Sequence, residues 1–155
     1  MSPIRPRRAA ALVWAVLALA AAGCDNPLTY QTDHLEAVEV VVRDAAGAEL
    51  ARTVENRRWE GPAAEHGLTV AAGTWLELQV TFLTLEGREV QLGVDRRDLS
   101  LRVAWDPEGL AVHEPLGARD RLLGLRPGQT ALRLLAWHGT HPDFVSPPLR
   151  LTITD

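Results

Sequence analysis

Two histidines and an aspartate crowd one short segment near the end of the chain. The segment reads Trp137-His138-Gly139-Thr140-His141-Pro142-Asp143-Phe144. Imidazole and carboxylate groups are good ligands for Zn²⁺ or Cu²⁺ at neutral pH. A tight turn at Gly139 would bring both imidazole rings to one side. The segment is therefore a candidate Zn²⁺ or Cu²⁺ site built from His138, His141 and Asp143.

The same segment also fits a loop between the last two strands that binds no metal. Its Gly-Thr and His-Pro-Asp sequences favour turns, and Asp143 can hydrogen-bond to the backbone of its own loop. His138 can pack beside Trp137, while His141 stays in solvent. A structural loop, a metal site and a loop that contacts a partner protein therefore all stand as interpretations.

Residues elsewhere in the chain are further candidates for the metal site and for the partner contact. The remaining imidazoles are further candidate ligands, although the sequence alone does not bring them together: His34, His66 and His113. Aromatic side chains that lie off the cleaner apolar patterns, or in the same segment, are candidate contacts for an envelope protein partner: Trp75, Trp137 and Phe144.

The motifs of familiar enzyme classes are missing from the sequence. It has no Gly-x-Ser-x-Gly elbow, phosphate-binding glycine loop, metalloprotease motif or dinucleotide fingerprint. Ser100 and Ser146 are the only serines after Cys24. Most acidic residues alternate with apolar ones, as solvent-facing strand positions do. We predict a non-enzymatic protein that needs no cofactor, with a bound Zn²⁺ or Cu²⁺ as the alternative.

The charge distribution disfavours nucleic acid as a partner. Three of the 16 basic residues and none of the 20 acidic residues precede Cys24, so the rest of the chain has 13 basic and 20 acidic residues, a net charge of −7. Such a surface repels phosphate backbones. Cys24 is also the single cysteine, which excludes intrachain disulfides and thiolate metal sites.

The first 23 residues have the features of an export signal. Arg5, Arg7 and Arg8 form a basic start, and residues 9–23 follow without a charge. This apolar run is shorter than the roughly 20 residues of a membrane-spanning helix. It ends in Leu19-Ala20-Ala21-Ala22-Gly23-Cys24, which resembles a bacterial lipobox, although the usual leucine three residues before the cysteine is Ala21 here.

The lipobox resemblance implies that Cys24 is acylated and becomes the first residue of the mature protein. Several acyl chains would give stable anchoring. We therefore predict a signal peptide over residues 1–23, a polar tether over 24–34 and a lipid anchor in the cell envelope, on the periplasmic face or the cell surface. An ordinary signal peptide with an incidental cysteine is the alternative interpretation.

Apolar and polar residues alternate with period two through most of the remaining chain. The clearest examples begin at Leu76, Leu99 and Leu149. Glycine and proline interrupt the pattern at roughly ten-residue intervals, as turns between short strands do. No window has helical spacing over three turns. The sequence predicts an all-β sandwich over residues 35–155, in which the strand pair at 35–61 either completes the sandwich or forms a separate hairpin.

The stretch 66–155 resembles the bacterial immunoglobulin-like group 2 domain. Its matching elements occur in the family's order: Leu68-Thr69-Val70-Ala71-Ala72-Gly73, the strand Leu76 to Phe82 followed by Gly87, Val103-Ala104-Trp105-Asp106, and Gly124-Leu125-Arg126-Pro127-Gly128-Gln129-Thr130. The resemblance implies an immunoglobulin-like sandwich and no catalysis. We therefore expect a non-enzymatic envelope lipoprotein whose domain is a binding or structural module, with a metal-binding accessory protein as the alternative.

Overall fold

A computed structural model describes residues 34–155. The predicted signal peptide, Cys24 and all of the tether except His34 lie outside the described residues. The described elements are twelve strands and one short helix: β1 (Ala37–Asp44), β2 (Glu49–Val54), β3 (Arg58–Glu60), α2 (Pro62–His66), β4 (Leu68–Ala71), β5 (Trp75–Thr84), β6 (Glu89–Val90), β7 (Leu99–Asp106), β8 (Ala111–Leu116), β9 (Arg119–Gly124), β10 (Gly128–His138), β11 (His141–Val145) and β12 (Leu149–Thr154).

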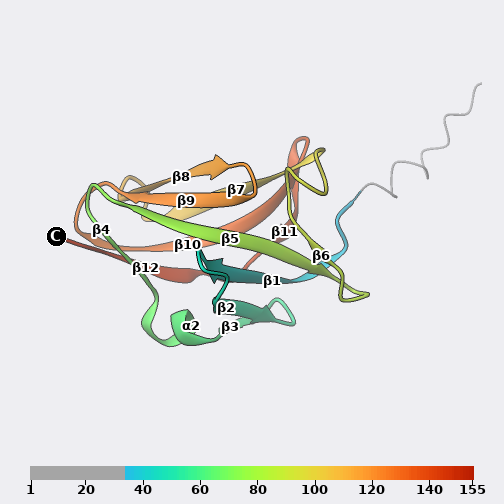
Figure 1. The fold of residues 1–155 in the computed structure, drawn as a ribbon, viewed down its shortest axis with the longest axis horizontal. Helices are drawn as coiled ribbons and strands as arrows, with labels where there is room; N and C mark the ends of the chain where they lie inside the picture. The colour runs from blue at the N-terminus through green and yellow to red at the C-terminus, as the bar shows by residue number, and fades with distance from the viewer. Residues whose placement is uncertain (1–33) are drawn as a thin grey trace, which may run out of the picture. The chain divides into compact units, whose positions relative to one another are not determined.

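The strands form two sheets (Figure 1). The first sheet has the order β3-β2-β1-β5-β9-β8, and β6 also pairs with β5. The second is built around the long strand β10, which pairs with β7 through residues 131–138. On its other edge β10 pairs with β12 near its start and with β11 near its end. β4 extends this sheet in parallel with β12.

Alternating side chains explain why the two sheets pack together. In β7 the buried or half-buried positions, beginning at Leu99, alternate with exposed positions that begin at Ser100. Apolar residues from both sheets join one core, in which the rings of Phe82 and Phe144 meet edge to face with centroids 5.5 Å apart. The predicted all-β sandwich is confirmed.

Strand pairing answers one question that the sequence left undecided and corrects one wrong prediction. β1 lies between β2 and β5, so the strand pair at 35–61 is part of the first sheet and no separate hairpin. The segment around His141 and Asp143, which the sequence places in a loop between the last two strands, contains the strand β11. The prediction missed β11 because Pro142 and Asp143 disfavour strands and obscure its alternation.

A two-residue turn brings His138 and His141 opposite each other. β10 and β11 form a hairpin in which His138 and His141 are directly opposed. Only Gly139 and Thr140 lie between them, and Gly139 has a φ of 52°, which costs a glycine nothing because it has no Cβ. The expected tight turn at Gly139 is confirmed.

Candidate metal centre

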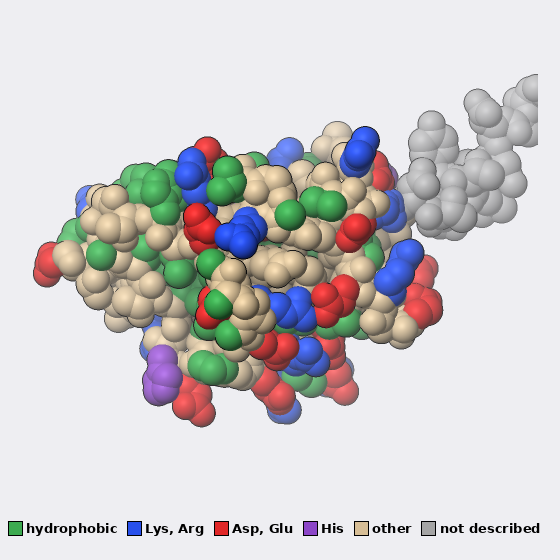
Figure 2. Space-filling model, in the orientation of Figure 1, with side chains coloured by type: hydrophobic (Ala, Val, Ile, Leu, Met, Phe, Trp, Pro, Cys, Tyr) green, Lys and Arg blue, Asp and Glu red, His purple; other side chains and the backbone are tan. Residues whose placement is uncertain are grey.

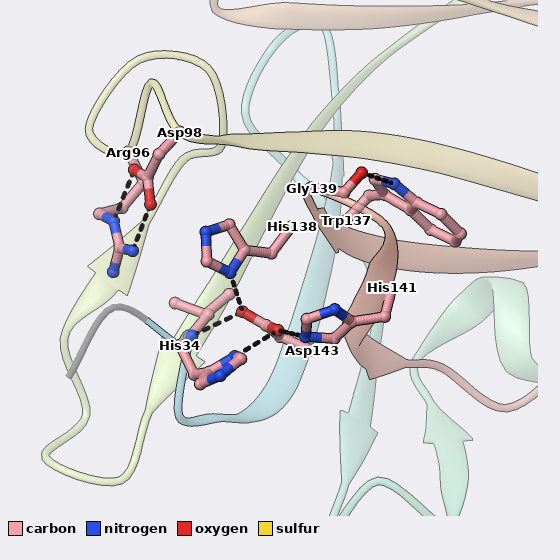
Figure 3. Close-up of polar contacts among 9 residues, drawn as sticks. His34, Arg96, Asp98, Trp137, His138, Gly139, His141 and Asp143 are labelled. Carbon is pink, nitrogen blue, oxygen red and sulfur yellow. Dashed lines mark hydrogen bonds and ion pairs between the residues drawn. The ribbon is translucent and has the colours of Figure 1, made fainter. Parts of the chain in front are cut away.

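Four side chains converge at one end of the β10–β11 hairpin: His34, His138, His141 and Asp143 (Figure 3). Each offers one ligand atom, and these atoms all lie within 4.8 Å of one another. The three imidazole rings surround the carboxylate, with ring centroids 5.3–5.9 Å apart. The structure thus brings together the three residues predicted from the sequence and adds one from the far end of the chain.

The β10–β11 hairpin positions three of the four side chains, those of His138, His141 and Asp143. Directly opposed residues of paired strands hold their side chains close together, which brings the rings of His138 and His141 into contact. Asp143 follows His141 by two residues, and strand alternation returns its side chain to the side of His141. The register shifts between Trp137 and Ala136, whose partners are Pro142 and Phe144, so Asp143 is the extra residue of a β-bulge with no partner on β10.

His34 enters the cluster through the backbone that leads into β1. The backbone N–H of Leu35 donates a hydrogen bond of 2.9 Å to Oδ2 of Asp143. The Leu35 side chain is buried in the core and fixes this segment. The neighbouring His34 then lies with its Nδ1 2.9 Å from Oδ1 of Asp143. Asp143 therefore joins two segments more than 100 residues apart, and its backbone partner is Leu35, not its own loop.

The Asp143 carboxylate is the buried centre of the cluster, since its side chain is only 2% exposed. Burial acts to raise its pKa, but the hydrogen bonds from Leu35 and His34 and the charges of His34 and His138 together hold the pKa below its ordinary value. The group is therefore ionised at neutral pH. A buried carboxylate among three imidazoles supplies negative charge where a cation would sit.

One nitrogen of the cluster has no hydrogen-bond partner. Nδ1 of His138 lies 3.9 Å from Oδ2 of Asp143, which is too long for a hydrogen bond. Among the described residues it is the one buried side-chain nitrogen or oxygen without a hydrogen-bond partner. Buried polar atoms are normally satisfied, so an orphan atom aimed into a cluster of ligands needs an explanation. A metal ion between the rings would supply its partner.

The separations suit a small four-coordinate ion. Tetrahedral Zn²⁺ with bonds near 2.0–2.1 Å places neighbouring ligand atoms about 3.3 Å apart. Oδ1 of Asp143 lies 2.9 Å from Nδ1 of His34 and 3.3 Å from Nε2 of His141, whereas its other oxygen, Oδ2, lies 3.9 Å from Nδ1 of His138. The four ligand atoms lie within 4.8 Å of one another, so the side chains would have to draw closer around an ion. All three imidazoles are partly open to solvent, which gives an ion access and lets the rings turn onto it.

The other two histidines of the described chain lie outside this cluster. His66 is exposed on α2, and its Nε2 lies 3.6 Å from Oε2 of Glu65. His113 of β8 is nearly buried, and its Nε2 lies 2.8 Å from Oδ1 of Asp120 in β9. Of the three further ligands considered from the sequence, only His34 joins the site.

The proposed aromatic contact residues do not form one surface. Phe144 is 5% exposed and packs against Phe82, so its assignment as a contact residue is wrong and it belongs to the core. Trp75 is exposed on β5 of the first sheet and stacks with Arg121. Trp137 lies on β10 of the second sheet, where it stacks with Arg102. Acidic and basic side chains are interspersed over the face drawn in Figure 2.

Within residues 34–155, no helix is both long and apolar enough to span a bilayer. No protein-family model and no curated protein matches the sequence.

Proposed function

We propose that this protein is a non-enzymatic, lipid-anchored protein of the cell envelope whose β-sandwich binds a divalent transition metal ion, with Zn²⁺ or Cu²⁺ as the ligand. The observation that carries the proposal is the convergence of His34, His138, His141 and Asp143 around the unpartnered Nδ1 of His138. A purely structural loop would not require four ligand-type side chains to face one point.

The donor set selects the class of metal. Imidazole nitrogens suit Zn²⁺, Cu²⁺ and related ions, whereas Ca²⁺ and Mg²⁺ prefer oxygen ligands. Three imidazoles and one carboxylate can fill a tetrahedral shell. A tetrahedral shell with four protein ligands is typical of structural zinc sites. A filled shell leaves no coordination position for a reactive water, in keeping with the non-enzymatic role.

The anchor determines where such a site would act. Acylation of Cys24 would place the lipid ten residues before His34. Ten residues of extended chain span at most about 36 Å. The metal would therefore be held near the membrane surface, at the point where the tether enters the domain. The immunoglobulin-like resemblance supports a binding module in this position.

The test is a metal titration of the full-length protein, purified in detergent and stripped with a chelator. We expect one equivalent of Zn²⁺ or Cu²⁺ to bind in competition with a chromogenic chelator, and Ca²⁺ and Mg²⁺ not to bind. The double variant His138→Ala/His141→Ala should lose this binding. His66→Ala is the matched control, because it removes an exposed imidazole outside the cluster. Equal affinities in wild type and double variant would refute the proposal.

A further inference from the structure

β7 is the outermost strand on one side of the second sheet. Through one edge it pairs with β10 along its whole length, and among the described residues its other edge pairs with no strand. A free edge offers unpaired N–H and C=O groups to another strand, so proteins commonly block it with proline, a bulge or a very short strand. β7 has eight residues, no proline and a continuous register with β10, so it is not blocked.

The other edge strands of the described chain are blocked. β8 contains Pro115, and β11 contains Pro142 and the bulge at Asp143. The strands β3, β4 and β6 have only three, four and two residues. Within residues 34–155, β7 is therefore the longest edge that another strand can join.

The inner face of β7 lines an open groove. Leu101, Val103 and Trp105 pack against the core but are only half-buried. They form one wall of a groove of about 470 Å³, and β8 forms the other wall with Ala111 and the exposed Val112. The groove thus opens between the edge strands of the two sheets. A strand edge from another molecule would take this apolar surface out of water.

The outer face of β7 carries two opposite charges that match a second copy of the same strand. Arg102 and Asp106 are exposed, share one face, and form no ion pair within residues 34–155. Arg102 stacks on Trp137 but donates no hydrogen bond within the same range. When two copies of β7 pair antiparallel about Ala104, each Arg102 lies opposite Asp106 of the other copy. An axis two residues earlier would instead oppose the two Arg102 side chains.

We propose that this protein forms a two-fold symmetric dimer by antiparallel pairing of β7 with β7 of a second copy. Main-chain hydrogen bonds join the two second sheets into one, and two pairs between Arg102 and Asp106 fix the register. The two β7–β8 grooves face each other across the axis and cover their half-buried apolar residues. The dimer needs none of the four metal ligands, so it stands or falls independently of the proposed metal site.

Charge reversal tests the pairing in the full-length protein, with the mass of the protein measured by sedimentation in density-matched detergent. We expect the mass of two chains for the wild type. Arg102→Asp and Asp106→Arg each set like charges opposite each other twice, so each should weaken the dimer about tenfold. The double variant Arg102→Asp/Asp106→Arg restores both pairs and should dimerise like the wild type. Arg57→Asp, in the turn between β2 and β3, is the control and should change nothing.

A single cysteine tests the register. In a full-length Cys24→Ser background, which leaves no other cysteine, Ala104→Cys should form an interchain disulfide on mild oxidation. Opposed residues of antiparallel strands have Cα atoms about 4.5–5.5 Å apart, within the range of a disulfide. Ser100→Cys lies on the same strand and face, but its two copies are eight residues apart along the strands, about 27 Å, and should stay unlinked.

Three results would overturn the dimer. The first is a wild type with the mass of one chain. The second is a double variant that dissociates as readily as the single variants, which would show that Arg102 and Asp106 do not meet. The third is equal cross-linking at residues 100 and 104. Each result would leave the metal titration, and with it the proposed function, to be decided on its own.

Discussion

Replacing Asp143 with alanine removes the group that joins the two segments of the site. Its carboxylate accepts hydrogen bonds of 2.9 Å from Leu35 N–H and from His34. An N–H left without an acceptor costs about 1–3 kcal/mol. The contact with the partly exposed His34 adds at most about 1 kcal/mol. In the metal-free protein we therefore expect Asp143→Ala to lower the free energy of unfolding by about 1–4 kcal/mol.

Asp143→Asn separates the hydrogen bond from the charge. The amide oxygen of asparagine can still accept the Leu35 N–H, so the metal-free variant should lose less than about 1 kcal/mol. A neutral amide nevertheless fails to supply the negative charge that the three imidazoles lack. Both Asp143 variants should therefore bind Zn²⁺ weakly, although only the alanine variant is strongly destabilised.

Urea unfolding, with and without Zn²⁺, measures both effects. Zn²⁺ at 100 times its dissociation constant should stabilise the wild type by about 2.7 kcal/mol, provided that it binds only the folded state. At the same concentration it should add little to either Asp143 variant. The reasoning is refuted if Asp143→Ala matches the wild type in chelator, or if Asp143→Asn keeps the full stabilisation by Zn²⁺.

Three further predictions concern the core, the Arg96–Asp98 ion pair and the proposed anchor. Phe144→Ala should lower the free energy of unfolding by about 3–5 kcal/mol in urea, because it leaves a cavity beside Phe82; a loss below about 1 kcal/mol would contradict its place in the core. Arg96→Ala should raise the pKa of Asp98 from about 2 toward 3.8 in an NMR titration of the carboxyl carbon. Because the folded-state pKa is the lowered one, any stability that this pair contributes is present above about pH 4 and lost as the pH falls toward 2. Cys24→Ser should move the protein from the detergent phase to the aqueous phase in a phase-separation assay, and an unchanged partition would argue against the lipid anchor.

The sandwich could be predicted from the sequence where each strand has one buried face. β5, β7 and β12 alternate clearly and were found at the expected places. The pattern fails in β8, an edge strand that contains Pro115 and exposes most of its side chains. An edge strand tolerates proline because one of its sides needs no hydrogen-bond partner, so its sequence carries little strand signal. Helix α2 has five residues, too few to show helical periodicity.

The site was predictable only as far as local spacing reaches. His138, His141 and Asp143 are close in sequence, and a two-residue turn is enough to bring them together. His34 precedes Asp143 by 109 residues, and its place depends on β1 joining the first sheet beside the β10–β11 hairpin. Such long-range pairings follow from the whole topology, which no short motif encodes.

The position of the cluster suggests why this domain would use a metal. His34 and Leu35 lead into a strand of the first sheet, whereas the other three ligands belong to the second sheet. Many extracellular sandwiches join their sheets with a disulfide, but the single cysteine here excludes one. If the proposed anchor holds, a pull on it would first reach His34 and Leu35, each of which makes one hydrogen bond to Asp143. An ion bound to His34 and to the hairpin would carry that load into β10, the central strand of the second sheet, so metal occupancy would set the strength of the attachment.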